Sequence, residues 1–269
     1  DLPLLANIPY YSALEGTRDQ KKNILKFLDD SIYDKPDSSI EEDIKIKNYE
    51  VFAYQEAFRN LYTNIKFIDD KTKTNSLLIT SSEPSEGKSL INIILCKTFS
   101  ELGLKVLLID CDFRRPQIHK RLGMNNLKGF SNLFFDKNFT WKDAIQKVKN
   151  YKNWDVITSG AKLVDPVRLL TSEKLSFLMR EIADSGQYDY IIYDCPPSYP
   201  FPDARLISKN IDGIILIVSI NQVSKDIPIN VIKQYSFEGI NFLGMITNTN
   251  KLTSSGNENK KFIDSYYSQ

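Results

Sequence analysis

The chain has 269 residues, enough for one large α/β domain with extensions or for two small domains. Its 35 lysines and arginines almost balance its 34 aspartates and glutamates, so the formal net charge of +1 favours neither nucleic acid nor an anionic membrane as a partner. No apolar run approaches the roughly 20 residues of a membrane-spanning helix. Because the chain begins at Asp1 without a signal segment, we expect an excised domain whose missing part could contain a membrane anchor.

The three cysteines and the single histidine do not predict a metal centre. Cys96, Cys111 and Cys195 are far apart and show no CxxC spacing, which argues against a zinc site and against a disulfide framework. We interpret them as small apolar residues of a protein in a reducing cytosol. His119 lies in a polar helical stretch, where a surface or capping role is favoured over catalysis.

Residues 1–48 start with an apolar segment, LPLLANIPYY, and then become polar and charged, with a loop marked by Pro36. We expect this part to be an arm or linker outside the core. From residue 49 to about residue 69, apolar residues recur near helical spacing. This pattern predicts an amphipathic helix that docks on the core or on a neighbouring subunit.

A strand, a turn and a helix follow in the segments NSLLIT, SSEPSEGKS and LINIILCKTFSELG. At such a junction, backbone N–H groups and the helix dipole can hold phosphate groups. Lys88 would bridge the phosphates and Ser89 would bind a magnesium ion. The turn departs from the GxxxxGK[ST] pattern, because Ser82 stands where the first glycine is expected.

The rest of the chain alternates between strands and helices. The predicted strands are KVLLID, WDVITSG, YDYIIYD, DGIILIVSI and FLGMITN; the predicted helical segments are a middle section that includes WKDAIQKV, then LLTSEKLSFLMREIAD and IPINVIKQYSF. Continuous apolar strands between helices indicate an α/β fold, with a doubly wound, mostly parallel sheet covered by helices on both faces. We place this core between about residues 75 and 250, and predict a mobile polar tail over residues 251–269.

Two of the predicted strands end in carboxylates. Asp110 and Asp112 follow VLLI, and Asp194 follows YIIY. The carboxyl ends of parallel strands share one edge of the sheet, so these residues should meet Lys88 in one crevice. Magnesium prefers such oxygen ligands, and one carboxylate could orient or deprotonate an attacking hydroxyl. Taken singly, each aspartate could equally be a strand-end or helix-cap residue.

Together these segments resemble the bacterial tyrosine kinases, the cytoplasmic kinase domains of polysaccharide co-polymerases, within the MinD- and ParA-like P-loop ATPases. SSEPSEGKS is similar to the family's Walker A motif, VLLIDCDFRRP to its Walker A′ and YDYIIYDCPP to its Walker B; DLPLLANIP resembles the segment that joins the membrane-spanning part to the kinase. The resemblance covers nearly the whole chain. It implies an ATP- and Mg²⁺-dependent autokinase that phosphorylates tyrosines and regulates exopolysaccharide or capsule polymerisation and export. Its place would be the cytoplasmic side of the bacterial inner membrane.

The resemblance also implies roles for individual residues. The catalytic group would be Lys88, Asp110 and Asp112, with Asp110 as the base for the tyrosine hydroxyl. The metal ligands would be Ser89, Asp112 and Asp194, and Asp203 is a further candidate carboxylate. The ATP-binding residues would be Ser85, Glu86, Gly87, Lys88, Ser89, Leu90 and Asn248.

The family arranges its subunits in a ring, and the tail of one subunit enters the site of the next. Tyr266 and Tyr267 resemble the phosphoacceptor tyrosines of that tail, and they lie in the mobile tail that we predict over residues 251–269. Glu56 and Arg59 match the family's ExxRxxR interface motif on the helix at 49–69, but Tyr62 replaces the last arginine. The implied partners are further copies of the chain, a fused or separate membrane-spanning activator and a tyrosine phosphatase, with no nucleic acid.

We predict that the kinase domain extends over residues 49–250. Its phosphate loop departs from the family pattern at two positions. Ser85 stands where the family has glycine, and Leu90 where it has threonine. Both changes predict weakened nucleotide affinity. They leave open the alternative that the chain is a catalytically weakened, nucleotide-binding scaffold of the export machinery. A MinD- or ParA-like positioning ATPase is the other alternative, although such proteins usually carry lysine at the position of Glu83.

Overall fold

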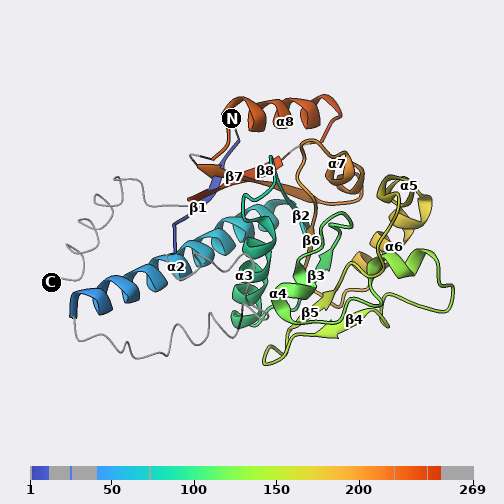
Figure 1. Cartoon of the computed structure of the whole chain (residues 1–269), viewed down its shortest axis with the longest axis horizontal. Helices are drawn as coiled ribbons and strands as arrows, with labels where there is room; N and C mark the ends of the chain where they lie inside the picture. The colour runs from blue at the N-terminus through green and yellow to red at the C-terminus, as the bar shows by residue number, and fades with distance from the viewer. Residues whose placement is uncertain are drawn as a thin grey trace.

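A single sheet of eight strands crosses the molecule, with helices on both faces (Figure 1). The computed structural model describes residues 2–11, 25, 41–72, 74–220, 222–240 and 242–249. The strands are β1 (Leu4–Ile8), β2 (Ser76–Ser81), β3 (Val106–Asp110), β4 (Ile145–Lys147), β5 (Trp154–Ile157), β6 (Tyr190–Asp194), β7 (Gly213–Ile220) and β8 (Phe242–Thr249). The helices are α2 (Glu41–Thr72), α3 (Lys88–Glu101), α4 (Ile118–Leu122), the 3₁₀ helix η2 (Phe130–Phe134), α5 (Pro166–Leu170), α6 (Glu173–Asp184), α7 (Asp203–Ser208) and α8 (Asp226–Phe237).

The strand order is β1-β8-β7-β2-β6-β3-β5-β4, and only the pairing of β4 with β5 is antiparallel among the described strands. The predicted doubly wound, mostly parallel α/β fold is therefore confirmed. Among the helices of the described part of the chain, none combines the length and the apolar character that crossing a bilayer requires.

The central strands bury both faces, which explains their continuous apolar sequences. In β2, Leu77 and Ile79 belong to the hydrophobic cluster shared with α2 and α3, whereas Leu78 faces the cluster shared with α6, α7 and α8. The alternation is the period of two that a strand imposes on its side chains. The two clusters fix the sheet between two layers of helices.

The N-terminal segment differs from our prediction. Residues 1–48 were expected to form an arm outside the core, but β1 pairs in parallel with β8 and buries Leu5 and Ile8. The side-chain amide of Asn64 on α2 also donates to the Leu5 carbonyl at 2.7 Å. Helix α2 starts at Glu41 rather than near residue 49. Local composition did not predict β1, because its pairing partner lies at the other end of the chain.

The segment WKDAIQKV was expected to be helical, and this prediction is wrong. The backbone N–H and the hydroxyl of Thr140 donate to the Asp143 carboxylate at 2.9 and 2.7 Å, and turns follow in place of a helix. This Thr-x-x-Asp contact resembles half of a capping box at a helix start, but the helix does not continue beyond these turns. The chain then enters β4, which uses the open edge of β5. The segment predicted as one helix from Leu169 divides into α5 and α6.

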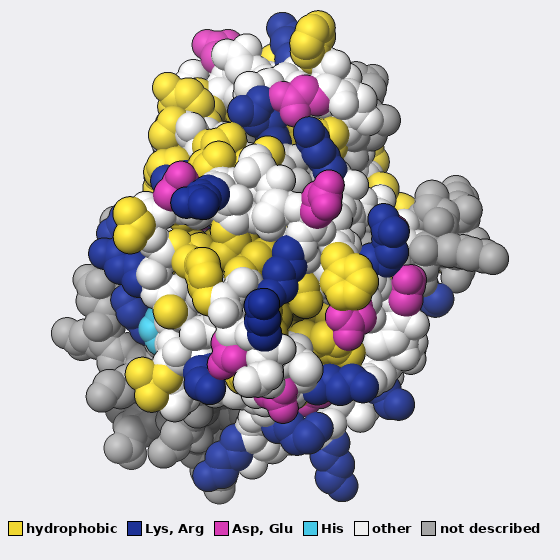
Figure 2. Space-filling view, turned by 90° about the vertical axis from the view of Figure 1, so that its right-hand side faces the viewer, with side chains coloured by type: hydrophobic (Ala, Val, Ile, Leu, Met, Phe, Trp, Pro, Cys, Tyr) yellow, Lys and Arg dark blue, Asp and Glu magenta, His cyan; other side chains and the backbone are white. Residues whose placement is uncertain are grey.

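The face that carries α5 and α6 presents hydrophobic side chains among lysines and arginines (Figure 2). Phe135, Val164 and Phe177 are exposed, and Phe177 lies on the side of α6 opposite its buried residues. Residues Trp141, Phe177 and Arg180 line a shallow groove there. Apolar side chains thus remain outside the core on this face.

Gly129 allows a close approach between two backbone segments. Its φ of −163° is extended and open to any residue, but a Cβ would lie 2.2 Å from the Thr158 carbonyl oxygen and 2.6 Å from the Gly160 nitrogen. We expect Gly129→Ala to lower the free energy of unfolding by about 2 kcal/mol, because backbone atoms must move apart. Urea unfolding measures the change.

Gly186→Asn is the control for this substitution, because a Cβ at Gly186 meets nothing within 4 Å and asparagine tolerates its φ of +62°. We expect its effect to stay below about 1 kcal/mol. Equal stability of the Gly129→Ala variant and the wild type would contradict the packing argument.

Candidate active site

The loop between β2 and α3 has the left-handed backbone that a phosphate-binding turn requires. Gly87, at the N-terminus of α3, has a φ of 91°, and a Cβ there would lie 2.5 Å from the side-chain nitrogen of Asn248. Glycine is therefore needed at this position for its conformation and for the close contact. Ser85 also has a positive φ, of 71°. For a residue with a Cβ, this conformation costs about 1 to 2 kcal/mol.

Glu86 fastens the loop to the sheet rather than facing outward. Its buried carboxylate accepts hydrogen bonds from the Ser219 backbone N–H at 2.7 Å, the Glu83 backbone N–H at 2.5 Å and the Ser82 hydroxyl at 3.0 Å. Burial raises the pKa of Glu86, and these hydrogen bonds oppose that shift. The amide of Asn248 donates to the Glu86 carbonyl at 2.9 Å. The ends of β7 and β8 therefore hold the loop in place.

Three strand ends meet beside this loop, as the sequence predicted. The Lys88 ammonium contacts the Asp112 carboxylate at 2.8 Å, and the Ser89 hydroxyl donates to Asp194 Oδ2 at 2.7 Å. Asp110 on β3 is the register partner of Asp194 on β6. Groups from β2–α3, β3 and β6 thus form one cluster at the carboxyl edge of the sheet.

The cluster contains three acidic groups, Asp110, Asp112 and Asp194, and one basic group, Lys88. Burial, followed by the charges of Asp194 and Asp112, raises the pKa of Asp110 well above its usual range, and burial also raises the pKa of Asp194. Burial alone would lower the pKa of Lys88, but Asp194 and Asp112 outweigh it and raise that pKa. Lys88 is therefore charged at neutral pH, and a further cation would favour ionisation of the carboxyl groups beside it.

The donor set suits magnesium that also binds a nucleotide. Within the residues that the structure describes, no three carboxylate, histidine or cysteine side chains form a cluster able to hold a metal. Ser89, Asp112 and Asp194 offer hard oxygen atoms, and Mg²⁺ usually binds one or two protein carboxylates together with phosphate oxygens and water. These residues fit such an ion.

Two residues near the cluster were not singled out by sequence reasoning. Asn92 is buried and donates to Asp194 Oδ1 at 2.7 Å. The sequence signal that could have indicated this residue is a polar side chain in an apolar helix, three positions after Ser89. Arg114 forms a two-point contact with Asp203, at 2.8 Å for each nitrogen, and lies over the Phe201 ring at 4.4 Å. Asp203 is therefore engaged by Arg114 and lies outside the Lys88 cluster.

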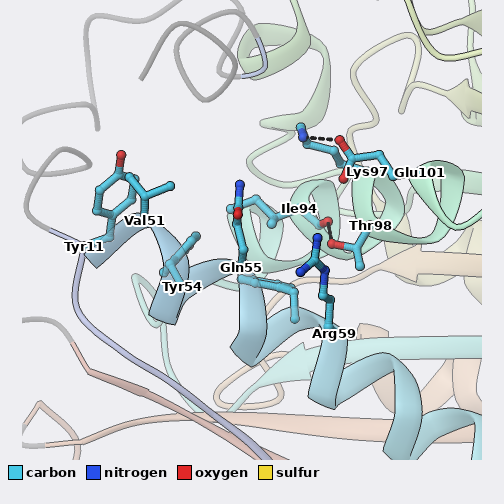
Figure 3. Close-up of a pocket in the computed structure, with 10 residues that line it drawn as sticks. Tyr11, Val51, Tyr54, Gln55, Arg59, Ile94, Lys97, Thr98 and Glu101 are labelled. Carbon is cyan, nitrogen blue, oxygen red and sulfur yellow. Dashed lines mark hydrogen bonds and ion pairs between the residues drawn. The ribbon is translucent and has the colours of Figure 1, made fainter. Parts of the chain in front are cut away.

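The predicted interface residues lie on α2, away from the loop. Arg59 contacts Glu56 at 2.6 Å, with 60% of the arginine side chain exposed. Arg59 lines a pocket of about 70 Å³ between α2 and α3, together with Tyr54 and Thr98 (Figure 3). Tyr62, in place of the motif's last arginine, packs edge-on against Phe99, with ring centroids 5.5 Å apart.

Of the remaining candidate site residues, the structure describes Leu90 but not the two tail tyrosines. Leu90 packs against the cluster on the α2–α3 face of the sheet. Tyr266 and Tyr267 lie outside the described residues.

Comparison with known proteins identifies the family. Residues 79–261 match the family model described as an AAA domain. The chain is 33% identical over 198 residues to the tyrosine-protein kinase YwqD of Bacillus subtilis, a match that covers 74% of this chain and 82% of that protein. The chain belongs to the bacterial tyrosine-protein kinases. The family membership predicted from the motifs is thus confirmed.

Other members of this family show how much of each protein is shared. The tyrosine-protein kinase CpsD of Streptococcus agalactiae is 30% identical over 195 residues, 72% of this chain and 82% of that protein. The tyrosine-protein kinase Wzc of Salmonella typhimurium is 30% identical over 196 residues, but these make up only 26% of that longer protein.

Solved structures support the same family fold. The chimerical protein CapA2B2 superposes with a TM-score of 0.71 at 27% identity, over 94% of this chain and 96% of that chain. The kinase domain of the Escherichia coli tyrosine kinase ETK gives 0.76 at 24% identity, over 94% and 92%. MinD of Pyrococcus horikoshii, solved with Mg-ADP, gives 0.54 at 22% identity over 65% and 70%, a likeness of fold alone.

The raised pKa values of the carboxylates predict how stability without metal depends on pH. The folded state of this kinase holds protons on Asp110 and Asp194 at pH values where the unfolded chain, with aspartate pKa values of about 3.9, has lost them. In EDTA, stability should therefore fall as the pH rises above about 4.

Asp194→Asn should reduce this loss and raise the free energy of unfolding at pH 7, with little effect near pH 4. The asparagine keeps an oxygen that accepts from Asn92, and its amide nitrogen can donate to the Ser89 hydroxyl in place of the bond that Ser89 donates in the wild type. Thermal and urea unfolding at both pH values measure the effect, with Asp184→Asn on the exposed side of α6 as the control. A destabilised variant at pH 7 would contradict the prediction.

Proposed function

We propose that this chain is an ATP-dependent protein-tyrosine autokinase that acts in exopolysaccharide or capsule polymerisation and export. The observation that carries the proposal is the convergence of Lys88, Ser89, Asp112 and Asp194 beside a left-handed loop at the N-terminus of α3. Residues 85–90 and Asn248 would form the ATP site. Its place would be the cytoplasmic side of the bacterial inner membrane.

The residues of the site would have different roles in phosphoryl transfer. A bound magnesium ion would neutralise charge on the phosphate oxygens. The loop amides and the dipole of α3 hold the phosphates, and the Lys88 ammonium adds a fixed positive charge. Such transfer depends mostly on positioning and on charge stabilisation.

Asp110 is the proposed base for the tyrosine hydroxyl. A raised pKa brings a carboxylate closer to neutral pH, where proton acceptance is most efficient. Its two oxygens accept the backbone N–H groups of Asp112 at 3.1 Å and Ile118 at 3.3 Å, and the side chain is fully buried. Acceptance of the tyrosine proton therefore requires movement of the segment 112–118.

The proposed acceptors are Tyr266 and Tyr267, reached in trans within a ring of identical subunits. The exposed Glu56–Arg59 pair on α2 would form part of the subunit interface. A membrane-spanning activator, fused or separate, and a tyrosine phosphatase complete the proposed set of partners.

A nucleotide-binding scaffold with little catalysis is the second candidate. The observation that favours it is the left-handed conformation of Ser85, whose side chain adds strain where the loop must approach a phosphate.

Mass spectrometry of phosphotyrosine after incubation with Mg-ATP tests the proposal. We expect phosphate on Tyr266 or Tyr267 in the wild type and none in Lys88→Met, because that variant lacks the ammonium that holds the phosphates. Lys209→Met, an exposed lysine beyond α7, is the matched control and should behave as the wild type. ATP-dependent dimers without phosphotyrosine would instead support a MinD-like ATPase, and neither signal would support the scaffold.

The two loop departures give a prediction about affinity. The variant Ser85→Gly, Leu90→Thr should bind ATP more tightly than the wild type, because glycine relieves the left-handed strain and threonine adds a hydroxyl beside the phosphates. Isothermal titration with ATP and Mg²⁺ measures the difference. Ser85→Ala keeps the Cβ and should bind no more tightly than the wild type; equal affinity of all three proteins would reject the idea.

A further inference from the structure

Helix α3 controls both oxygens of the Asp194 carboxylate. Asn92 donates to Oδ1 at 2.7 Å and Ser89 donates to Oδ2 at 2.7 Å. The two residues are three positions apart, so they lie on the same face of the helix. The carboxylate is therefore held by two donors from a single rigid element, at the end of the neighbouring strand β6.

Asn92 is a poor choice for stability alone. It is fully buried on a helix whose neighbouring residues Ile91, Ile93 and Ile94 belong to the hydrophobic core. Its side-chain carbonyl oxygen, Oδ1, has no hydrogen-bond partner among the residues that the structure describes. A buried acceptor left without a partner destabilises the fold. The asparagine therefore needs a reason other than packing.

The hydrogen bonds around Asp194 supply such a reason. Asn92 donates to Oδ1, whereas Oδ2 lies with the Ser89 hydroxyl, the oxygen that we assign to the magnesium ion. Hydrogen bonds to a carboxylate are among the stronger ones, so the Asn92 amide holds Oδ1 on the side of the helix. It also fixes the plane of the carboxylate, because one oxygen cannot turn away from the helix.

We infer that Asn92 is a positioning residue of the magnesium site, which holds Asp194 so that Oδ2 and the Ser89 hydroxyl face the ion together. The inference rests on the proposed magnesium–nucleotide function. Asn92 acts through Asp194 and does not itself bind the ion. Residues behind a metal ligand orient it, and their loss typically costs 10- to 100-fold in metal affinity.

The test uses the full chain with Asn92→Leu, which keeps the side-chain size and removes the amide. Cys96→Ala is the control, because Cys96 is the buried residue one turn further along α3. Binding of fluorescent ADP is measured in EDTA and across a magnesium titration, together with the thermal midpoint without nucleotide. Asn92→Ala serves as a second variant that removes the amide without adding apolar bulk.

We expect both Asn92 variants to need about tenfold more magnesium for half-maximal enhancement of ADP binding. Their ADP affinity in EDTA should equal that of the wild type. The thermal midpoint of Asn92→Leu should be unchanged or higher, since the unpartnered carbonyl is gone. Cys96→Ala should keep the magnesium requirement of the wild type.

Three outcomes overturn the inference. An unchanged magnesium requirement in both Asn92 variants shows that the amide does not position Asp194. Loss of ADP affinity in EDTA together with a lower thermal midpoint in both variants shows a purely structural role. If the wild type itself binds ADP without any magnesium dependence, the proposed magnesium–nucleotide function fails and the inference fails with it, a result distinct from the other two.

Discussion

One ammonium group surrounded by three carboxylates organises this molecule. Lys88, at the start of α3, contacts Asp112, which follows β3. The negative charges of Asp194 and Asp110, at the ends of β6 and β3, also raise the pKa of Lys88. A single cation cannot neutralise three buried acids, and two of those acids have raised pKa values as a result of their burial. The proposed need for a second cation follows from this imbalance.

The loop beside this cluster is held by the protein alone. The Glu86 carboxylate accepts hydrogen bonds from within the loop and from the end of β7, and Asn248 binds the loop from β8. Hydrogen bonds of this kind restrict the loop and so reduce the conformational entropy that it would lose on binding a ligand. The strain at Ser85 acts against this advantage, because part of the stability of the loop maintains a conformation unfavourable to serine.

Local chemistry made the central part of the fold and site predictable from the sequence. Strands β2, β3 and β6 are continuous apolar runs that end in polar residues, so both their burial and the meeting of Lys88 with the aspartates could be anticipated. Strand β1 and strand β4 could not, because each depends on a partner edge that local composition does not reveal. Asn92 and the Arg114–Asp203 contact were missed for a similar reason, since their partners are distant in sequence.

Strand β1 also pairs with an edge of β8 that would otherwise be open. It is five residues long and covers the edge of β8, an eight-residue strand, FLGMITNT, that contains no charged side chain. An uncovered edge of that length and composition offers unpaired N–H and carbonyl groups to any other extended chain. A shortened form of the kinase that began at α2 would keep the residues of the candidate active site but expose this edge of β8, and we expect it to be less soluble in concentrated solution.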